Sequence, residues 1–416
     1  MKKIIICVLC VSFVILLFLL LNKNTVDQET KKMVDLSNYT IDDLKQYASE
    51  NSLNLKINEI YSDEFPINMI INQSIKIGEE FFSNDNLAVD LVIGTLDDKK
   101  NMEIKIYNDY NVNELGRVPI MMYHGIHHKN NSDTDYIGGN IDKDGYQRTS
   151  EAFRNDLEFY YQNNYRMIRL SDYVDGIIDV ELGKSPIILT FDDGLQNNIN
   201  VMGLDENGEI IIDPNCAIGI LEEFKNKYPD YNVTATFFVN AGLFNQPEYN
   251  EKIMKWLVEN NYDIGNHTST HADFTKIDLN ETNYQIGKVY ELLDSIIPNQ
   301  YVNIVALPYG SPYKKSHANF ENIFNANYNG KIYNTKSALR VGWESDYSPF
   351  SIDFDKTFLK RIRAYDNNGE EFDIEMNFKI LEKNRYISDG NIDKIVVKKS
   401  DLNLVNNEFN LEIIAY

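Results

Sequence analysis

From Val118 onward, short apolar runs alternate with stretches whose apolar residues recur at helical spacing. The strand-like runs are residues 118–124, 186–191, 235–239 and 303–309, and the helix-like stretches between them include residues 150–164 and 251–261. This alternation predicts a parallel α/β architecture, which we expect to be a barrel. In such barrels the chemistry lies where the strands end, so the polar residues that follow apolar runs are the candidates.

The N-terminus carries an almost unbroken apolar stretch over residues 4–21, preceded by Lys2 and Lys3. Its length is at the short limit for a membrane span, and no small-x-small cleavage site follows it. We therefore expect an uncleaved signal-anchor over residues 1–22, with the remainder of the chain outside the cell. The alternative is a cleaved secretion signal, which would make the protein secreted.

A small module is predicted next, after a polar stalk over residues 23–32. Thr40 with Asp43 three positions later is typical of a capping box, so a helix is expected to begin there. Alternating or apolar runs then predict three strands at residues 53–57, 69–74 and 87–94.

This order of one helix and three strands, with the phrases MIINQS and VDLVIG, resembles a PASTA domain over residues 33–96. The resemblance implies binding to cell-wall peptidoglycan. A spacer that holds the next domain away from the membrane is the alternative.

Composition removes some classes of function. The 416 residues include 63 Asp and Glu against 40 Lys and Arg, a formal net charge of −23. A chain this acidic repels polyphosphate, so we expect no nucleic-acid partner. Of three cysteines, Cys7 and Cys10 lie in the N-terminal apolar run, so no intrachain disulfide framework is expected outside it.

The first candidate site follows the run PIILTF, which leads directly into Asp192 and Asp193. Two adjacent carboxylates at a strand end repel each other unless a cation or a proton lies between them. A surface turn is the alternative interpretation, because Asp-Asp-Gly is a common turn sequence.

The second candidate is the segment HTSTH, in which His267 and His271 are four residues apart. We expect one helical turn to place both imidazoles on one face. Two imidazoles with one carboxylate form a typical catalytic zinc site that leaves one position open for water. Two solvated or capped histidines are the alternative, although the chain has only six histidines.

FDDG, HTSTH and the later ALPYG together resemble the polysaccharide deacetylases (NodB-homology, carbohydrate esterase family 4) over residues 116–365. The resemblance implies a distorted (β/α) barrel and a hydrolase that removes N-acetyl groups from a cell-surface amino-sugar polymer.

The resemblance also implies roles for individual residues. It makes Asp193, His267 and His271 the ligands of Zn²⁺, with another divalent ion such as Co²⁺ as an alternative. It makes Asp192 the catalytic base, and it assigns the backbone N–H of Tyr309 to the oxyanion.

Some positions depart from the common family pattern. Ala306 stands where many members have arginine, as in a branch that includes enzymes acting on poly-N-acetylglucosamine, so Arg361 is expected to orient the base instead of being a surface charge. His124, in an early Tyr-His segment, is expected to be the acid instead of a structural histidine. Trp343, by contrast, matches the hydrophobic fourth motif of the family, and this resemblance implies that it walls the acetyl pocket, with a core position as the alternative.

Three functions remain open beside N-deacetylation. The site could cleave O-acetyl esters of a wall or plant polysaccharide, the chain could be a non-catalytic wall-binding protein, or the metal could be iron with oxidation chemistry. The polymer is also open between peptidoglycan and poly-N-acetylglucosamine. Residues 195–216 form an insertion beside the site, and residues 366–416 are expected to be a β-rich C-terminal extension.

Overall fold

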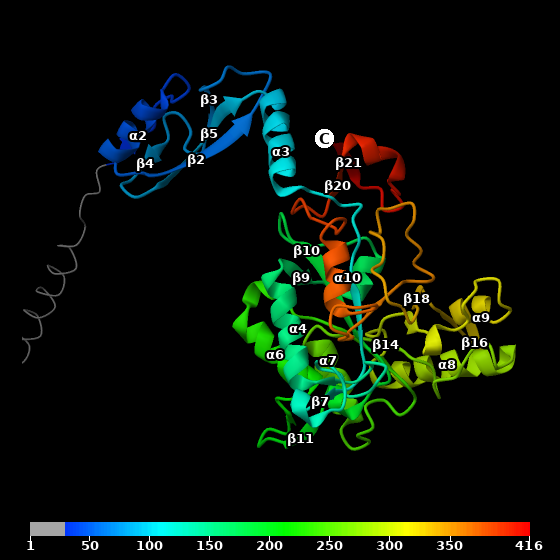
Figure 1. Cartoon of the computed structure of the whole chain (residues 1–416). Helices are drawn as coiled ribbons and strands as arrows, with labels where there is room; N and C mark the ends of the chain where they lie inside the picture. Colours follow the sequence, from blue (N-terminus) through cyan, green and yellow to red (C-terminus); the bar gives the residue numbers. More distant parts are fainter. Residues whose placement is uncertain (1–29) are drawn as a thin grey trace, which may run out of the picture. The chain divides into compact units, whose positions relative to one another are not determined.

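A computed structural model describes residues 30–416 of the chain (Figure 1). The expected anchor over residues 1–22 and residues 23–29 of the expected stalk lie outside the described residues. None of the helices in residues 30–416 combines the length and the apolar content needed to span a bilayer. The chain divides into two compact units, one ending at Ile106 and one over Tyr107–Tyr416.

The small unit contains a three-stranded sheet, a two-stranded sheet of β1 and β4, helix α2 and the first part of helix α3. The strand order of the three-stranded sheet is β2-β5-β3, with β2 and β5 parallel and β3 antiparallel to β5. Helix α2 begins at the predicted capping box, where Thr40 and Asp43 cap each other. The elements are β1 (Lys31–Lys32), α2 (Ile41–Glu50), β2 (Asn54–Tyr61), β3 (Ile70–Gln73), β4 (Glu80–Phe81) and β5 (Asn86–Gly94).

Helix α3 (Leu96–Tyr110) was not among the predicted elements. Its start carries a second capping box, because the Asp98 carboxylate accepts the N–H of Thr95 at 2.9 Å and Thr95 Oγ1 accepts the N–H of Asp98 at 3.1 Å. Of its 15 residues only Tyr107 is buried, so the helix lacks the apolar stripe that pattern reading requires.

The large unit is built on a curled parallel sheet, which confirms the predicted α/β class. Leu339, in the strand at one edge of the sheet, pairs in parallel with Leu359, which lies just before the strand at the other edge, so the two edges approach each other. In pairing order the strands are β18 (Ser337–Leu339), β15 (Ile304–Ala306), β14 (Asp263–Asn266), β13 (Thr236–Val239), β10 (Ser185–Phe191), β6 (Ile120–Tyr123) and β19 (Ile362–Arg363), with β9 (Tyr165–Met167) also on β10.

Helices cover the outside of this sheet (Figure 1). They are α4 (Ser150–Gln162), α6 (Ala217–Lys227), α7 (Asn250–Glu259), α8 (Leu279–Ile296), α9 (Phe320–Phe324) and α10 (Ile374–Leu381). Helix α5 (Leu170–Val174) instead packs its buried residues into the cluster that contains Ile188. Short pairs of strands lie in the connections: β7 (Ile126–His127) with β8 (Arg148–Thr149), β11 (Val201–Leu204) with β12 (Ile210–Ile212), β16 (Asn325–Tyr328) with β17 (Lys331–Asn334), and β20 (Lys394–Val397) with β21 (Glu412–Ala415).

The expected β-rich extension over residues 366–416 contains helix α10 as well as β20 and β21. Glu114 attaches this extension to the rest of the large unit. Its buried carboxylate accepts hydrogen bonds from the Tyr386 hydroxyl at 3.0 Å and from the N–H groups of Asp389 and Val396 at 3.2 and 2.6 Å. Burial, together with the charge of Asp389, raises the pKa of Glu114 to about 8.

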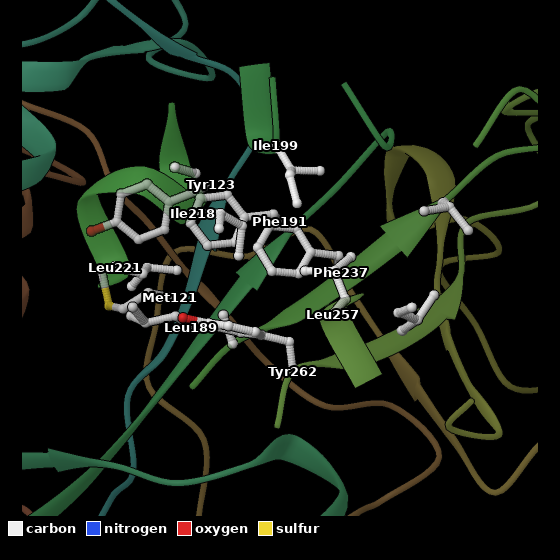
Figure 2. Close-up of a cluster of buried hydrophobic side chains, with 14 of the residues drawn as sticks. Met121, Tyr123, Leu189, Phe191, Ile199, Ile218, Leu221, Phe237, Leu257 and Tyr262 are labelled. Carbon is white, nitrogen blue, oxygen red and sulfur yellow. The ribbon is translucent and has the colours of Figure 1, made fainter. Parts of the chain in front are cut away.

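The two faces of the sheet carry different parts of the core. Tyr123, Phe191 and Phe237 from neighbouring strands stack on one face, with ring centroids 5.3 and 4.9 Å apart (Figure 2). Ile188 in β10 belongs to the buried cluster of the opposite face. Since side chains alternate along a strand, Asp192 continues the face of Ile188, which is the concave face of the sheet.

The aromatic stack gives a stability prediction. Phe237→Ala should lower the free energy of unfolding of the large unit by about 3–5 kcal/mol, because it leaves a cavity beneath fully buried rings. Denaturant unfolding measures this, with Ile332→Ala as the control because Ile332 is 60% exposed and should change the value by less than about 0.5 kcal/mol. Equal effects for the two variants would contradict this packing.

Candidate active site and metal centre

The candidate residues gather at the carboxyl ends of the parallel strands. His124 follows β6, Asp192 and Asp193 follow β10, and His267 follows β14. Tyr309 lies in the 3-10 turn Pro308–Gly310 after β15. Segments far apart in the sequence therefore supply one site, as expected for a parallel sheet of this kind.

Asp193, His267 and His271 form a cluster of possible metal ligands. Oδ1 of Asp193 lies 3.2 Å from Nε2 of His267 and 3.5 Å from Nε2 of His271, and the three ligand atoms lie within 4.8 Å of one another. Bonds of about 2.1 Å in a tetrahedral zinc site put neighbouring ligands about 3.4 Å apart. The donor set and its spacing thus fit a zinc-sized ion.

The ring of His267 is oriented by a second contact. Its Nδ1 donates to the carbonyl of Ala306 at 2.8 Å, which leaves the lone pair of Nε2 directed toward Asp193. Nε2 is buried and has no hydrogen-bond partner in residues 30–416, which fits a group that is completed by a metal ion. Burial lowers the pKa of His267, but the charges of Asp192 and Asp193 outweigh it and leave the pKa raised.

The predicted helical turn between the two histidines is wrong. Strand β14 ends at Asn266, and the following loop is not helical because Thr268 and His271 have left-handed backbones with φ of 68° and 58°. A helix needs φ near −63° at every position. The loop is held by Asn240, whose Nδ2 donates to the carbonyls of His267 at 2.8 Å and Thr268 at 2.9 Å.

Asp192 is bound by the guanidinium of Arg361 in a buried bidentate pair. Nη1 lies 2.8 Å from Oδ1 and Nη2 lies 2.7 Å from Oδ2, and the side chains are 1% and 0% exposed. Burial raises the pKa of Asp192, but the charge of Arg361 outweighs it and holds this pKa far below its usual range. Asp192 is therefore ionised at neutral pH.

Arg361 is itself fixed by groups that pattern reading did not single out. Its Nε donates to the carbonyl of Arg340 at 2.8 Å, and Nη1 also lies 3.2 Å from Oγ1 of Thr190. Thr190 interrupts the apolar run PIILTF two residues before Asp192, on the same face of the strand. The polar residue at this position of an apolar strand could have indicated from the sequence that Thr190 belongs to the site.

His124 lies at the edge of the same site. Its Nδ1 is buried without a hydrogen-bond partner in residues 30–416, and its ring packs edge-on against Tyr146 with centroids 4.9 Å apart. Burial lowers the pKa of His124 despite the opposing charges of Asp192 and Asp193. The lowered pKa makes protonated His124 a stronger acid, and it leaves the ring mostly neutral at neutral pH before a substrate binds.

Tyr309 and Trp343 both expose their side chains. Tyr309 is 55% exposed and has φ of 58°, and the centroid of its ring lies 4.7 Å from that of the His271 ring. A non-glycine residue in this backbone region carries strain, and strain of this kind clusters at functional sites. Trp343 is 54% exposed, so it is not a core residue, and its ring centroid lies 5.4 Å from that of Phe372.

The insertion over residues 195–216 forms the hairpin of β11 and β12. Gln246 anchors its start, because its Oε1 accepts the N–H of Val201 at 2.9 Å and its Nε2 donates to the carbonyl of Ile199 at 2.7 Å. The hairpin is therefore attached to the segment that follows β13.

Comparison with known proteins identifies the class of the large unit. Residues 221–326 match the family model described as polysaccharide deacetylase, so the chain carries a polysaccharide deacetylase domain and the resemblance noted from its motifs is confirmed. The matched segment includes His267, His271 and Tyr309.

Solved structures with some likeness to this chain include two deacetylases. One is the deacetylase PplD from Streptococcus pyogenes in complex with acetate, at 19% identity over 60% of this chain and 92% of that chain, with a TM-score of 0.43. Another is a de-N-acetylase from Aggregatibacter actinomycetemcomitans, at 11% identity over 59% of this chain and 94% of that chain, with a TM-score of 0.38.

A third structure is the three-PASTA-domain of a Ser/Thr kinase from Staphylococcus aureus, at 16% identity over 38% of this chain and 96% of that chain, with a TM-score of 0.14. All three TM-scores are below 0.5, so nothing below rests on these likenesses. The PASTA assignment of residues 33–96 stays a prediction.

Proposed function

We propose that the protein is a metal-dependent hydrolase that removes N-acetyl groups from a cell-surface amino-sugar polymer. The observation that carries this proposal is the Asp193, His267 and His271 cluster beside an Asp192 carboxylate that Arg361 keeps ionised. A divalent ion in this cluster, Zn²⁺ in our proposal, would lower the pKa of a water molecule and polarise the acetyl carbonyl.

Each protein group then has one task. Asp192 accepts the proton of the attacking water, and Arg361 holds its two oxygens in place. The backbone N–H of Tyr309 donates to the oxygen of the tetrahedral intermediate. His124 donates a proton to the departing nitrogen as the C–N bond breaks, so the products are acetate and a free amino sugar.

Acetate release from purified peptidoglycan and from N-acetylglucosamine oligomers, followed in parallel with zinc-loaded protein, tests the proposal. Acetate and free amine from either polymer would support it. No release from either one, with zinc confirmed as bound, would contradict it.

Substitution of His124 distinguishes N-acetyl hydrolysis from the alternative, hydrolysis of O-acetyl esters. An amine leaving group needs protonation, whereas an ester needs less help from an acid. His124→Gln should therefore lower kcat on N-acetylated oligomers by roughly 10²-fold or more, with a much smaller loss on an acetyl ester. His127→Gln is the matched control, because His127 pairs with Gln147 at 2.9 Å outside the proposed machinery. Full N-acetyl activity in His124→Gln would favour the esterase.

We also propose that the protein is anchored in the cell membrane by residues 4–21 with its catalytic unit outside, and that residues 33–96 bind peptidoglycan. The lysines before the apolar run and the PASTA-like phrases support this arrangement. Fractionation of cells that make the full chain tests the anchor, and recovery only in the medium would contradict it.

A further inference from the structure

Arg363 is the last residue of β19 and follows Arg361 by two positions. Side chains two residues apart lie on one face of a strand, about 7 Å apart along it. Arg363 pairs in register with Met122 of β6, the strand whose end carries His124. It therefore lies on the same concave face as Asp192 and His124, two residues beyond Arg361 along β19 and level with Thr190, which also pairs with Met122.

The guanidinium of Arg363 forms no ion pair and no side-chain hydrogen bond with residues 30–416. Its Nε is buried without a partner, and the residue as a whole is half-buried. Two neighbouring arginines differ in having ion pairs, since Arg361 binds Asp192 and Arg148 binds Asp156 at 2.7 Å and Asp366 at 3.0 Å, although Arg148 also has a buried Nε without a partner. The charge of Arg363 is thus not neutralised by a carboxylate in residues 30–416, and its guanidinium can bind an anion.

Two tyrosines hold the cation in place. The Cζ atom of Arg363 lies 5.1 Å from the ring centroid of Tyr146 and 4.9 Å from that of Tyr365, both within cation–π range. The ring of Tyr146 also packs against His124, so a single aromatic ring separates the guanidinium from the proposed acid.

The loop that carries Tyr146 is itself pre-organised. The Asp142 carboxylate accepts the N–H groups of Asp144, Tyr146 and Gln147, each at 3.1 Å. Gly145 has φ of 66°, and a Cβ there would lie 2.2 Å from the ring of Tyr365, so only glycine permits this close approach.

We propose that Arg363 binds an anionic substituent of the polymer, a carboxylate or a phosphate, next to the sugar whose acetyl group is removed. This inference rests on the proposed function and decides between its two candidate polymers. Arginine suits planar, bidentate recognition of such anions. Because the chain carries a net charge of −23, its general field repels anions, and an arginine without an ion pair, one aromatic ring away from His124, is a local exception. An anion-bearing polymer such as peptidoglycan is thereby favoured over neutral poly-N-acetylglucosamine.

The test compares kcat/KM for three N-acetylated oligosaccharides of equal length: one neutral, one with lactyl carboxylates on alternate sugars, and one with a phosphate. The protein should prefer a charged substrate, and Arg363→Gln should reduce the charged-to-neutral ratio by roughly tenfold or more, mainly through KM, because a charge-assisted hydrogen bond is lost. Arg363→Lys should retain part of the preference. The charged substrate that is favoured identifies the anion.

Arg385→Gln is the matched control. Arg385 also stacks on an aromatic ring, with Cζ 5.3 Å from the centroid of Tyr165, and donates to the carbonyl of Asn163 at 2.8 Å, away from the site. Its substitution removes the same charge and should leave the ratio unchanged.

The outcomes separate this inference from the proposed function. Acetate release with the same charged-to-neutral ratio in the unaltered protein and in Arg363→Gln would overturn the role of Arg363 alone. No release from any substrate would overturn the deacetylase proposal. Calorimetric binding of the three oligosaccharides would then still test Arg363, and equal affinities with and without it would contradict the inference.

Discussion

Asp192→Asn is expected to lower kcat for acetyl release by roughly 10²- to 10⁴-fold while the metal site stays intact. The asparagine keeps the shape of the side chain but cannot accept the proton of the attacking water. Metal content should not change, because Asp192 is not one of the three clustered ligands. Steady-state kinetics together with metal analysis of the same preparation measures both properties.

The substitution also weakens a buried ion pair, so a control for stability is needed. Asp263→Asn is matched, because Asp263 is 1% exposed and accepts from Arg169 Nε and from Ser171 Oγ, both at 2.8 Å, at the opposite end of the strands. Both variants should lose roughly 1–3 kcal/mol of stability, and only Asp192→Asn should lose turnover. Activity of Asp192→Asn within tenfold of the unaltered protein would exclude Asp192 as the base.

Removal of the metal is expected to abolish turnover, and Zn²⁺ or Co²⁺ should restore it at one equivalent per chain. Asp193→Asn should bind the ion much more weakly, since the cluster loses its only carboxylate. The two adjacent carboxylates are therefore expected to have different roles. Asp193→Asn should lose both the metal and activity, whereas Asp192→Asn should lose activity alone. Activity that survives exhaustive chelation, or tight zinc binding by Asp193→Asn, would contradict this assignment.

The affinity for metal should also depend on pH. Binding requires neutral His267, whose pKa is raised in the folded protein by Asp192 and Asp193 against the effect of burial. Protons therefore compete with the ion as pH falls through this raised pKa, and affinity should decrease toward acid. Titration calorimetry over a pH series measures the trend, and affinity that rises toward acid would oppose it.

Much of the site was predictable because its residues follow apolar strands. The end of β10 marks Asp192 and Asp193, and the end of β6 marks His124, since parallel strands bring their carboxyl ends to one edge. Arg361 was predicted only through family resemblance, and the structure shows the physical basis of that expectation in its bidentate contact with Asp192.

Other features depend on tertiary contacts that a local pattern does not encode. The loop from His267 to His271 has helical spacing in sequence but left-handed residues in space, and Asn240 from another strand end holds it. Helix α3 has a cap but no apolar stripe. Arg363 looks like an ordinary surface charge in the sequence, and only the folded chain shows it between two tyrosines and without a partner.

The most direct test of the central claim, metal-dependent hydrolysis of an N-acetyl group at this site, is to count acetate and free amine released by metal-free and by zinc-loaded protein from the same N-acetylated oligosaccharide. We expect equal amounts of acetate and amine with zinc, and neither product without it or with zinc-loaded Asp192→Asn. Acetate without amine would indicate an esterase, and no acetate from protein with confirmed bound zinc would contradict the account.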